Sequence, residues 1–221
     1  MPLLWHKHCM IIQSEVSIII NTIIFDIGNV LLDFDYMKQF RRLFDEQTAQ
    51  TIADISIRKP EIWVEMDRGV LSYEEAVNLI IQGAPHLENE IRLAIKELYE
   101  NVDCFPYAVD WVKHLKKKGY RIYILSNYGE KPFADSKVHM PFLQFVDGKL
   151  ISYEIQEVKP NAAIYQTICD RFSINLNEAV FIDDSAANIT GAQAFGLNTI
   201  LFKTYEDAVD QLRRLPLTYG I

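Results

Sequence analysis

The chain has 221 residues, of which 49% are hydrophobic and 24% are charged, and its formal net charge is −8. This composition is typical of a globular protein with a large core and room for a second small domain. An acidic surface repels phosphate backbones, so nucleic acid is not an expected partner. The basic cluster at residues 113–121 falls at the end of a predicted helix, where cations suit the helix dipole, and we interpret it as solvated surface.

Residues 1–21 form an N-terminal extension without a signal-peptide core and without the roughly 20 apolar residues of a membrane span. His6 and His8 are interpreted as part of a loose tail rather than as metal ligands. Three cysteines lie far apart and form no CxxC pattern: Cys9, Cys104 and Cys169. So sparse a set is typical of a reducing compartment. We therefore expect a cytoplasmic protein that does not contact membranes.

The first predicted strand, Ile23–Phe25, ends on a carboxylate, Asp26, and Gly28 follows two residues later. From Tyr36 to Asn101 the apolar residues recur at helical spacing. The segment SYEEAVNLIIQG shows this pattern well, with a Ser72–Glu75 capping box at its start and Gly83 at its end. Residues 36–101 are therefore predicted to form a small all-helical insertion.

After the insertion, helical and strand patterns alternate. An α/β fold with a doubly wound parallel sheet, covered by helices on both faces, is predicted for residues 22–35 and 102–221. An Asp-Gly turn within 145–155 also predicts a β-hairpin. The predicted elements are helix 106–118, strand 121–127, the hairpin, helix 161–172, strand 179–184, helix 186–195, strand 198–202 and helix 205–215.

Four polar residues directly follow three of the predicted buried strands. Asp26 follows the first strand, Ser126 follows YIL, and Asp183 and Asp184 follow VFI. In open α/β sheets the carboxyl ends of the strands form the ligand-binding edge, so we expect these residues to converge. One acid after a strand is usually a helix cap, but three such strand ends together indicate a site.

Convergent carboxylates repel one another, so three of them in one crevice need a cation. Oxygen ligands favour a hard ion such as Mg²⁺, which commonly also binds a substrate phosphate. Lys159 precedes a predicted helix, with Pro160 at the first helical position, and is a candidate fixed positive charge. The sequence has no GxxxxGK[ST], GxGxxG or GxSxG motif. A carboxylate nucleophile that forms an aspartyl-phosphate beside a metal is the chemistry that remains.

These motifs resemble those of the haloacid dehalogenase-like phosphohydrolases. FDIGNVLLD is similar to their first motif, LSN to the second, VKPNAAIY to the third and FIDDSAANITGA to the fourth, and order and spacing agree from about residue 22 to 202. The resemblance is strongest to a branch with a DxGNV first motif, which includes bacterial phosphatases of sugar phosphates such as glucose 1-phosphate. It implies that the helical insertion, residues 36–101, is a cap over the active site.

The resemblance also implies a role for each matching residue. Asp26 would be the nucleophile and a metal ligand, the Gly28 carbonyl and Asp184 would be further Mg²⁺ ligands, and Lys159 would steady phosphate and nucleophile. Asp183 would pair with Lys159 or hold metal-bound water. Ser126 and the backbone of Asn127 would bind the substrate phosphate. Asn188 stands where many relatives carry another acid, so the resemblance assigns it no metal role.

Gly28 departs from the family pattern, because most phosphatases of the superfamily carry there an aspartate that protonates the leaving group and activates water. Three functions therefore stay open. The favoured one is a Mg²⁺-dependent phosphatase of a small phosphometabolite such as a sugar phosphate, acting as a monomer or homodimer. The alternatives are a 2-haloacid dehalogenase, which the acid pair Asp183–Asp184 disfavours, and a non-catalytic phosphate-binding or regulatory protein. Four cap residues are candidates for substrate selection: Trp63, Glu65, Asp67 and Arg68.

Overall fold

A computed structural model of the protein describes residues 19–221. His6, His8 and Cys9 lie outside the described residues. The folded core includes Ile20, which is buried and whose backbone N–H donates to the carbonyl of Pro216 at 2.7 Å. The core thus begins slightly before residue 22, where the sequence pattern placed its start. Within residues 19–221 no helix is both long and apolar enough to cross a membrane.

A parallel five-stranded sheet forms the centre of the core, with the strand order β5-β4-β1-β6-β7. In this sheet Phe25 of β1 is level with Ile124 of β4 and with Ile182 of β6. The polar residues that follow these strands therefore lie at one edge of the sheet. The strands are β1 (Thr22–Phe25), β4 (Arg121–Ser126), β5 (Gly148–Ile151), β6 (Ala179–Asp183) and β7 (Asn198–Leu201).

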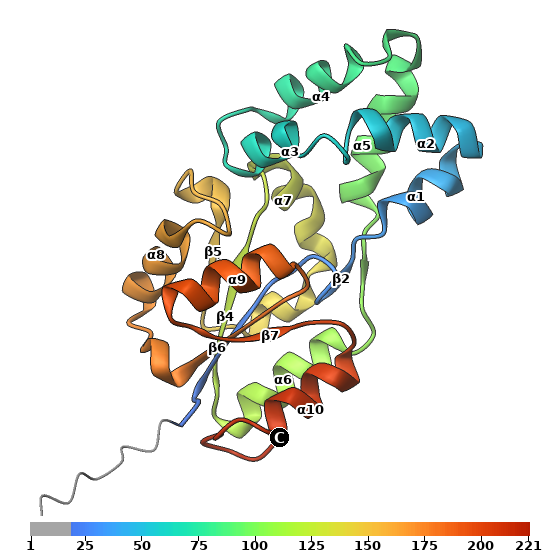
Figure 1. Cartoon of the computed structure of the whole chain (residues 1–221). Coiled ribbons are helices and arrows are strands. Elements are labelled where there is room, and N and C mark those ends of the chain that lie inside the picture. The colour runs from blue at the N-terminus through green and yellow to red at the C-terminus, as the bar shows by residue number, and fades with distance from the viewer. Residues whose placement is uncertain (1–18) are drawn as a thin grey trace, which may run out of the picture.

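Helices cover both faces of this sheet, as Figure 1 shows. Alternate residues of β1 face opposite sides, so Ile23 and Phe25 belong to one hydrophobic cluster and Ile24 to another. The first cluster includes buried residues of α6 (Ala108–Lys118) and α10 (Tyr205–Arg213), and the second those of α8 (Ala162–Phe172) and α9 (Ala186–Phe195). This arrangement confirms the predicted doubly wound α/β fold.

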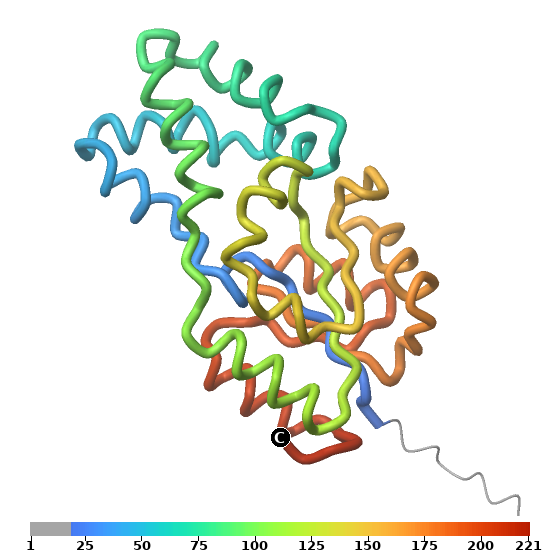
Figure 2. The backbone as a smooth tube through the Cα atoms, turned by 180° about the vertical axis from the view of Figure 1, so that it is seen from behind, coloured from blue at the N-terminus to red at the C-terminus, as the bar shows by residue number. Residues whose placement is uncertain are grey.

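Between Tyr36 and Glu100 the chain is helical and lies above the strand ends (Figures 1 and 2). The predicted capping box is present at Ser72 and Glu75. Two short strands, β2 (Leu32–Asp33) and β3 (Asp103–Cys104), pair antiparallel and carry the chain into and out of this cap. The cap helices are α1 (Tyr36–Leu43), α2 (Glu46–Ile55), α3 (Pro60–Asp67), α4 (Tyr73–Ile81), a 3₁₀ helix (Pro85–Leu87) and α5 (Glu88–Glu100).

Core side chains hold the cap by hydrogen bonds to its backbone. The hydroxyl of Ser136, at the end of α7 (Glu130–Ser136), donates to the carbonyl of Tyr99 at 3.1 Å. His139 lies 2.8 Å from the carbonyl of Glu100 through its Nε2. The remaining short elements are 3₁₀ helices at Lys137–His139, Pro141–Phe145, Ser152–Glu154 and Leu176–Glu178.

Two local predictions are wrong. Residues 145–155 do not form a hairpin, because β5 pairs parallel with β4 and a 3₁₀ helix follows it. The carboxylate of Asp147 accepts hydrogen bonds from the Ile122 backbone N–H and the Lys116 ammonium, both at 2.7 Å, and so fixes the entry to β5 instead of a tight turn. Pro160 is not the first residue of α8 either, since it lies in a turn and Asn161 is the N-cap.

Candidate active site

Asp26 and Asp183 flank the ammonium group of Lys159 at the ends of the adjacent strands β1 and β6. The Lys159 Nζ lies 2.9 Å from Oδ1 of Asp26 and 2.6 Å from Oδ2 of Asp183. It also donates to the carbonyl of Leu125 at 3.1 Å. All three side chains are buried. The structure therefore brings together the three residues that the sequence nominated for catalysis, although they lie far apart along the chain.

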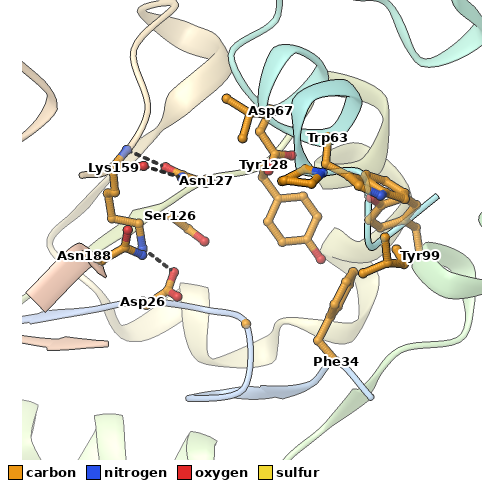
Figure 3. A pocket seen from close by; sticks show the side chains of 14 residues that line it. Asp26, Phe34, Trp63, Asp67, Tyr99, Ser126, Asn127, Tyr128, Lys159 and Asn188 are labelled. Atoms are coloured by element: carbon orange, nitrogen blue, oxygen red, sulfur yellow. Dashed lines mark hydrogen bonds and ion pairs between the residues drawn. The ribbon is translucent and has the colours of Figure 1, made fainter. Parts of the chain in front are cut away.

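The loop that carries Lys159 is fixed to the end of β4 by Asn127. The Asn127 side-chain carbonyl accepts from the Lys159 backbone N–H at 2.9 Å, and its amide donates to the Lys159 carbonyl at 3.0 Å (Figure 3). Gly191 of α9 lets this loop pack closely, because a Cβ atom there would lie 2.5 Å from the carbonyl of Pro160. The Asn127 side chain therefore positions Lys159, and Ser126 lines the same cavity.

Asp184 and Asn29 form a second contact across the strand ends. The side-chain amide of Asn29 donates to Oδ2 of Asp184 at 3.0 Å. Asn29 has a φ of 54°, in the left-handed region that asparagine tolerates better than most residues. Sequence analysis did not nominate Asn29. Its place between Gly28 and an apolar run was the available signal, since such a turn residue commonly needs a positive φ.

A divalent cation fits the donor set at this edge. Asp26, Asp183 and Asp184 each offer a carboxylate oxygen, and these oxygens lie within 4.8 Å of one another. Both oxygens of Asp183 also accept from the amide of Asn188 at 3.1 Å, and one accepts from the Ser185 N–H at 2.7 Å. Asp183 is thus held by protein donors, whereas Asp26 and Asp184 are the more available ligands. Asn188 thus acts by holding the carboxylate of Asp183. The position of Asn188 in the sequence did not indicate this contact.

Burial and charge have opposite effects on the pKa values of the candidate catalytic residues. Desolvation raises the pKa of Asp26 to about 6, although Lys159 lowers it and Asp183 raises it further. Burial lowers the pKa of the Lys159 ammonium, but the carboxylates of Asp183 and Asp26 outweigh burial and hold that pKa above its ordinary value. Desolvation also raises the pKa of Asp184, against the hydrogen bond from Asn29. Lysine therefore stays charged, and the uncompensated negative charge favours a cation.

A cavity of about 280 Å³ connects this edge of the sheet with the cap. Of the four cap residues nominated for selectivity, Trp63 and Asp67 line it. Glu65 and Arg68 instead form an ion pair, with 3.3 Å between Arg68 Nε and Glu65 Oε1. The lining residues, most of them labelled in Figure 3, are Asp26, Gly28, Phe34, Ile57, Pro60, Trp63, Val64, Asp67, Tyr99, Ser126, Asn127, Tyr128, Lys159 and Asn188.

Gly28 lines the cavity in a conformation that does not require glycine. Its φ is outside the left-handed region, and a Cβ atom built there would meet no heavy atom within 4 Å. The absence of a side chain at this position is therefore a chemical feature of the site rather than a steric need of the turn.

Comparison with known proteins gives relatives that include dehalogenases and phosphatases. The chain is 30% identical over 117 residues to (S)-2-haloacid dehalogenase 4A of Burkholderia cepacia, covering 52% of this chain and 51% of the relative. It is 26% identical over 193 residues to D-ribitol-5-phosphate phosphatase of Bacteroides thetaiotaomicron, covering 81% and 90%. The chain spans about half the length of the dehalogenases that it matches.

A solved structure and a family model point to the same superfamily as these relatives. A HAD family enzyme from Bacteroides thetaiotaomicron, solved with magnesium and inorganic phosphate, superposes with a TM-score of 0.69 at 21% identity, covering 88% of this chain and 100% of that chain. The family model for haloacid dehalogenase-like hydrolases matches residues 20–196. This match covers most of the chain and contains every nominated site residue. The protein therefore belongs to the haloacid dehalogenase-like hydrolases.

Proposed function

We propose that this hydrolase is a Mg²⁺-dependent phosphatase that cleaves a small phosphomonoester through an aspartyl-phosphate on Asp26. The observation that carries the proposal is the cluster of Asp26, Asp183 and Asp184 around one buried lysine at the strand ends. Such a cluster suits a hard cation and a phosphoryl group, whose negative charges need both the metal and Lys159.

Each residue of the cluster has a defined task in this reaction. Asp26 attacks phosphorus, and the bond from phosphorus to the leaving oxygen breaks. Lys159 keeps the attacking carboxylate ionised and oriented, while Ser126 and the backbone N–H groups after it bind phosphate oxygens. Bound Mg²⁺, held by Asp26, Asp184 and the Gly28 carbonyl, would neutralise charge on the phosphoryl group. Water then releases phosphate and regenerates Asp26.

The cavity limits what the leaving group can be. Its volume of about 280 Å³ suits a small molecule rather than a phosphoprotein. The cap side is mainly apolar, with Ile57, Pro60, Trp63 and Val64, and Asp67 is the one carboxyl group among the described cap residues that line it. We therefore infer a compact substrate with an apolar face. A sugar phosphate fits only if its apolar face stacks on the aromatic residues that line the cavity, which are Phe34, Trp63, Tyr99 and Tyr128.

The dehalogenase alternative rests on the dehalogenase relatives and on Gly28, since dehalogenases likewise lack the second acid. The acid pair Asp183–Asp184 favours the phosphatase, because a reaction that needs no metal gains nothing from three carboxylates within 4.8 Å.

A paired assay tests the proposed function. The purified protein is offered a panel of phosphomonoesters and, separately, 2-chloropropionate, each with Mg²⁺ and with EDTA. Phosphate release that requires Mg²⁺, without chloride release, supports the proposal. Chloride release that persists in EDTA would identify a dehalogenase. Binding of inorganic phosphate without turnover of any substrate would identify a non-catalytic phosphate-binding protein.

A further inference from the structure

The proposed reaction needs a group that moves protons at the leaving oxygen, and neither Gly28 nor Asp183 of the core is placed to do so. Gly28 has no side chain. Asp183 is fully buried and accepts hydrogen bonds from Lys159, Ser185 and Asn188, so it is not placed to meet the leaving group. The inference below rests on the proposed phosphatase function and identifies the missing group on the cap.

Asp67 is the last residue of α3 and lines the cavity from the cap side. Figure 3 shows its side chain and that of Asp26 on opposite sides of the cavity. In phosphoryl transfer the attacking and leaving oxygens are roughly in line with phosphorus. A phosphoryl group attacked by Asp26 therefore directs its leaving oxygen away from the sheet, toward the cap side of the cavity, where Asp67 lies.

The core fixes the position of Asp67. Its backbone carbonyl accepts a hydrogen bond from the hydroxyl of Ser152, which in turn accepts from the Tyr128 backbone N–H at 2.9 Å. Gly129 permits this approach, because a Cβ atom there would lie 3.0 Å from the carbonyl of Met66. The cap thus delivers Asp67 to a defined place in the cavity.

The surroundings of Asp67 keep both its protonation states accessible near neutral pH. Desolvation raises the pKa of Asp67 to about 7, the Gly129 backbone N–H and the Lys159 ammonium lower it, and Asp26 raises it. Tyr99 and Tyr128 also face this group, and burial raises the pKa of each phenol, so both stay neutral. A proton-transfer group works best with a pKa near the working pH.

The neighbouring arginine does not neutralise Asp67. Arg68 is ion-paired with Glu65 at 3.3 Å and with Glu157 at 3.7 Å, and none of these three residues lines the cavity. Among the described residues that line the cavity, Asp67 is the one carboxyl group besides Asp26.

We propose that Asp67 is the general acid and general base of this enzyme, in place of the side chain that Gly28 lacks. As Asp26 bonds to phosphorus, the Asp67 carboxyl gives its proton to the leaving oxygen, and the alcohol departs. The Asp67 carboxylate then takes a proton from water as that water attacks phosphorus. The bond from phosphorus to Asp26 breaks, phosphate leaves, and Asp67 is again protonated.

The test uses two substrates with similar rings and different leaving groups. 4-Nitrophenyl phosphate releases a stable anion, whereas benzyl phosphate releases an alkoxide that needs a proton. In Asp67→Asn, kcat/KM should fall by about 10²–10⁴-fold for benzyl phosphate and by less than about 10-fold for 4-nitrophenyl phosphate. The variant should also release a burst of one equivalent of 4-nitrophenol, because hydrolysis of the aspartyl-phosphate loses its base.

Two further variants separate proton transfer from structure. Glu65→Gln also replaces a carboxylate by an amide on the same helix, but outside the cavity. It should leave kcat/KM for both substrates unchanged. Gly28→Asp, at a position where a Cβ atom would meet no heavy atom within 4 Å, should restore benzyl phosphate cleavage when combined with Asp67→Asn. Melting temperatures confirm that each variant is folded.

Each outcome decides the inference. An equal loss on both substrates without a burst would show that Asp67 only binds or positions substrate and would overturn the proposal. Rates in Asp67→Asn within twofold of the natural enzyme would also overturn it. If the natural enzyme releases no phosphate from either ester or from the panel above, the proposed function fails first, and this inference fails with it.

Discussion

Asn29 donates a hydrogen bond of 3.0 Å to the carboxylate of Asp184, and so joins the turn after β1 to the end of β6. The contact orients the carboxylate of Asp184, a proposed metal ligand. Removing the side chain should weaken Mg²⁺ binding about 10–100-fold, which is typical of groups that orient metal ligands. Asn29→Gly is the suitable variant because glycine accepts the φ of 54° without strain.

The measurement is the Mg²⁺ concentration that gives half-maximal activity, together with calorimetric titration of Mg²⁺. Thr190→Ala is the control, because its hydroxyl donates to the carbonyl of Ala186 within α9. An unchanged Mg²⁺ affinity in Asn29→Gly would show that Asp184 is oriented without it, or that it is not a ligand.

Asp26→Asn should lower kcat by more than about 10³-fold, because the amide keeps the shape of the side chain and is not a nucleophile. The protein should remain folded, since Lys159 keeps Asp183 as its partner at 2.6 Å. Mass spectrometry of peptides from the quenched natural enzyme should locate the phosphoryl group on Asp26. Turnover near the natural level in the variant would place the nucleophile elsewhere.

Removal of metal should abolish phosphatase activity, and Mg²⁺ should restore it. A second readout does not depend on turnover: Mg²⁺ at 100 times its Kd should add about 2.7 kcal/mol to the free energy of unfolding, seen as a higher melting temperature. Asp184→Asn should lose most of this shift. Full activity in a preparation shown to be free of metal would contradict the role given to the three carboxylates.

The charge of Asp67 should make stability depend on pH. Its pKa is about 7 in the folded protein and about 3.9 when unfolded, so the unfolded chain ionises first as pH rises. The contribution of Asp67 to stability is therefore most favourable below pH 4 and falls as pH rises to about 7. Because the side chain borders the cavity, solvent there lowers the cost of its charge. We therefore expect its contribution to the free energy of unfolding to change by about 3 kcal/mol.

Urea unfolding of the natural protein and of Asp67→Asn between pH 4.5 and 7.5 isolates this effect, because asparagine does not titrate. The natural protein should lose stability relative to the variant across this range. A difference that stays constant with pH would show that the Asp67 pKa is ordinary, and would also weaken its assignment as a proton-transfer group.

Lys159→Met should destabilise the fold as well as stop catalysis. It removes the positive charge between Asp26 and Asp183 and leaves two buried carboxylates unpaired. Breaking a buried ion pair in this way costs about 3–5 kcal/mol. The loss should be smaller in saturating Mg²⁺, which compensates the same charges. A melting temperature equal to that of the natural protein without metal would contradict this account.

The ends of the strands were predictable because a buried strand that stops on an acid is a local pattern. β1, β4 and β6 end beside Asp26, Ser126 and Asp183 as expected, and parallel pairing aligns their ends. The supporting contacts were not predictable in the same way. Asn29 and Asp184 are 155 residues apart along the chain, and their contact depends on two side-chain directions that the folded sheet sets.

The hairpin prediction failed for a related reason. The Asp147–Gly148 pair is typical of a tight turn, yet its conformation is decided by groups distant in sequence, namely the Lys116 ammonium and the backbone of Ile122. Likewise, helical periodicity could not separate Asp67, which lines the cavity, from Glu65, which does not. Both lie near the end of α3, and only the packing of the cap on the core distinguishes them.

The antiparallel pairing of β2 with β3 places Leu32 opposite Cys104, so the chain leaves and re-enters the core at neighbouring points. The cap therefore begins and ends at neighbouring points of the core, so its length does not alter the spacing of any strand in the five-stranded sheet. Exchange of residues 36–100 for another helical unit would leave Asp26 in place but would remove Asp67, which the cap supplies. In this architecture, replacing the cap changes substrate choice and proton transfer together, so a new cap must also supply an acid–base group.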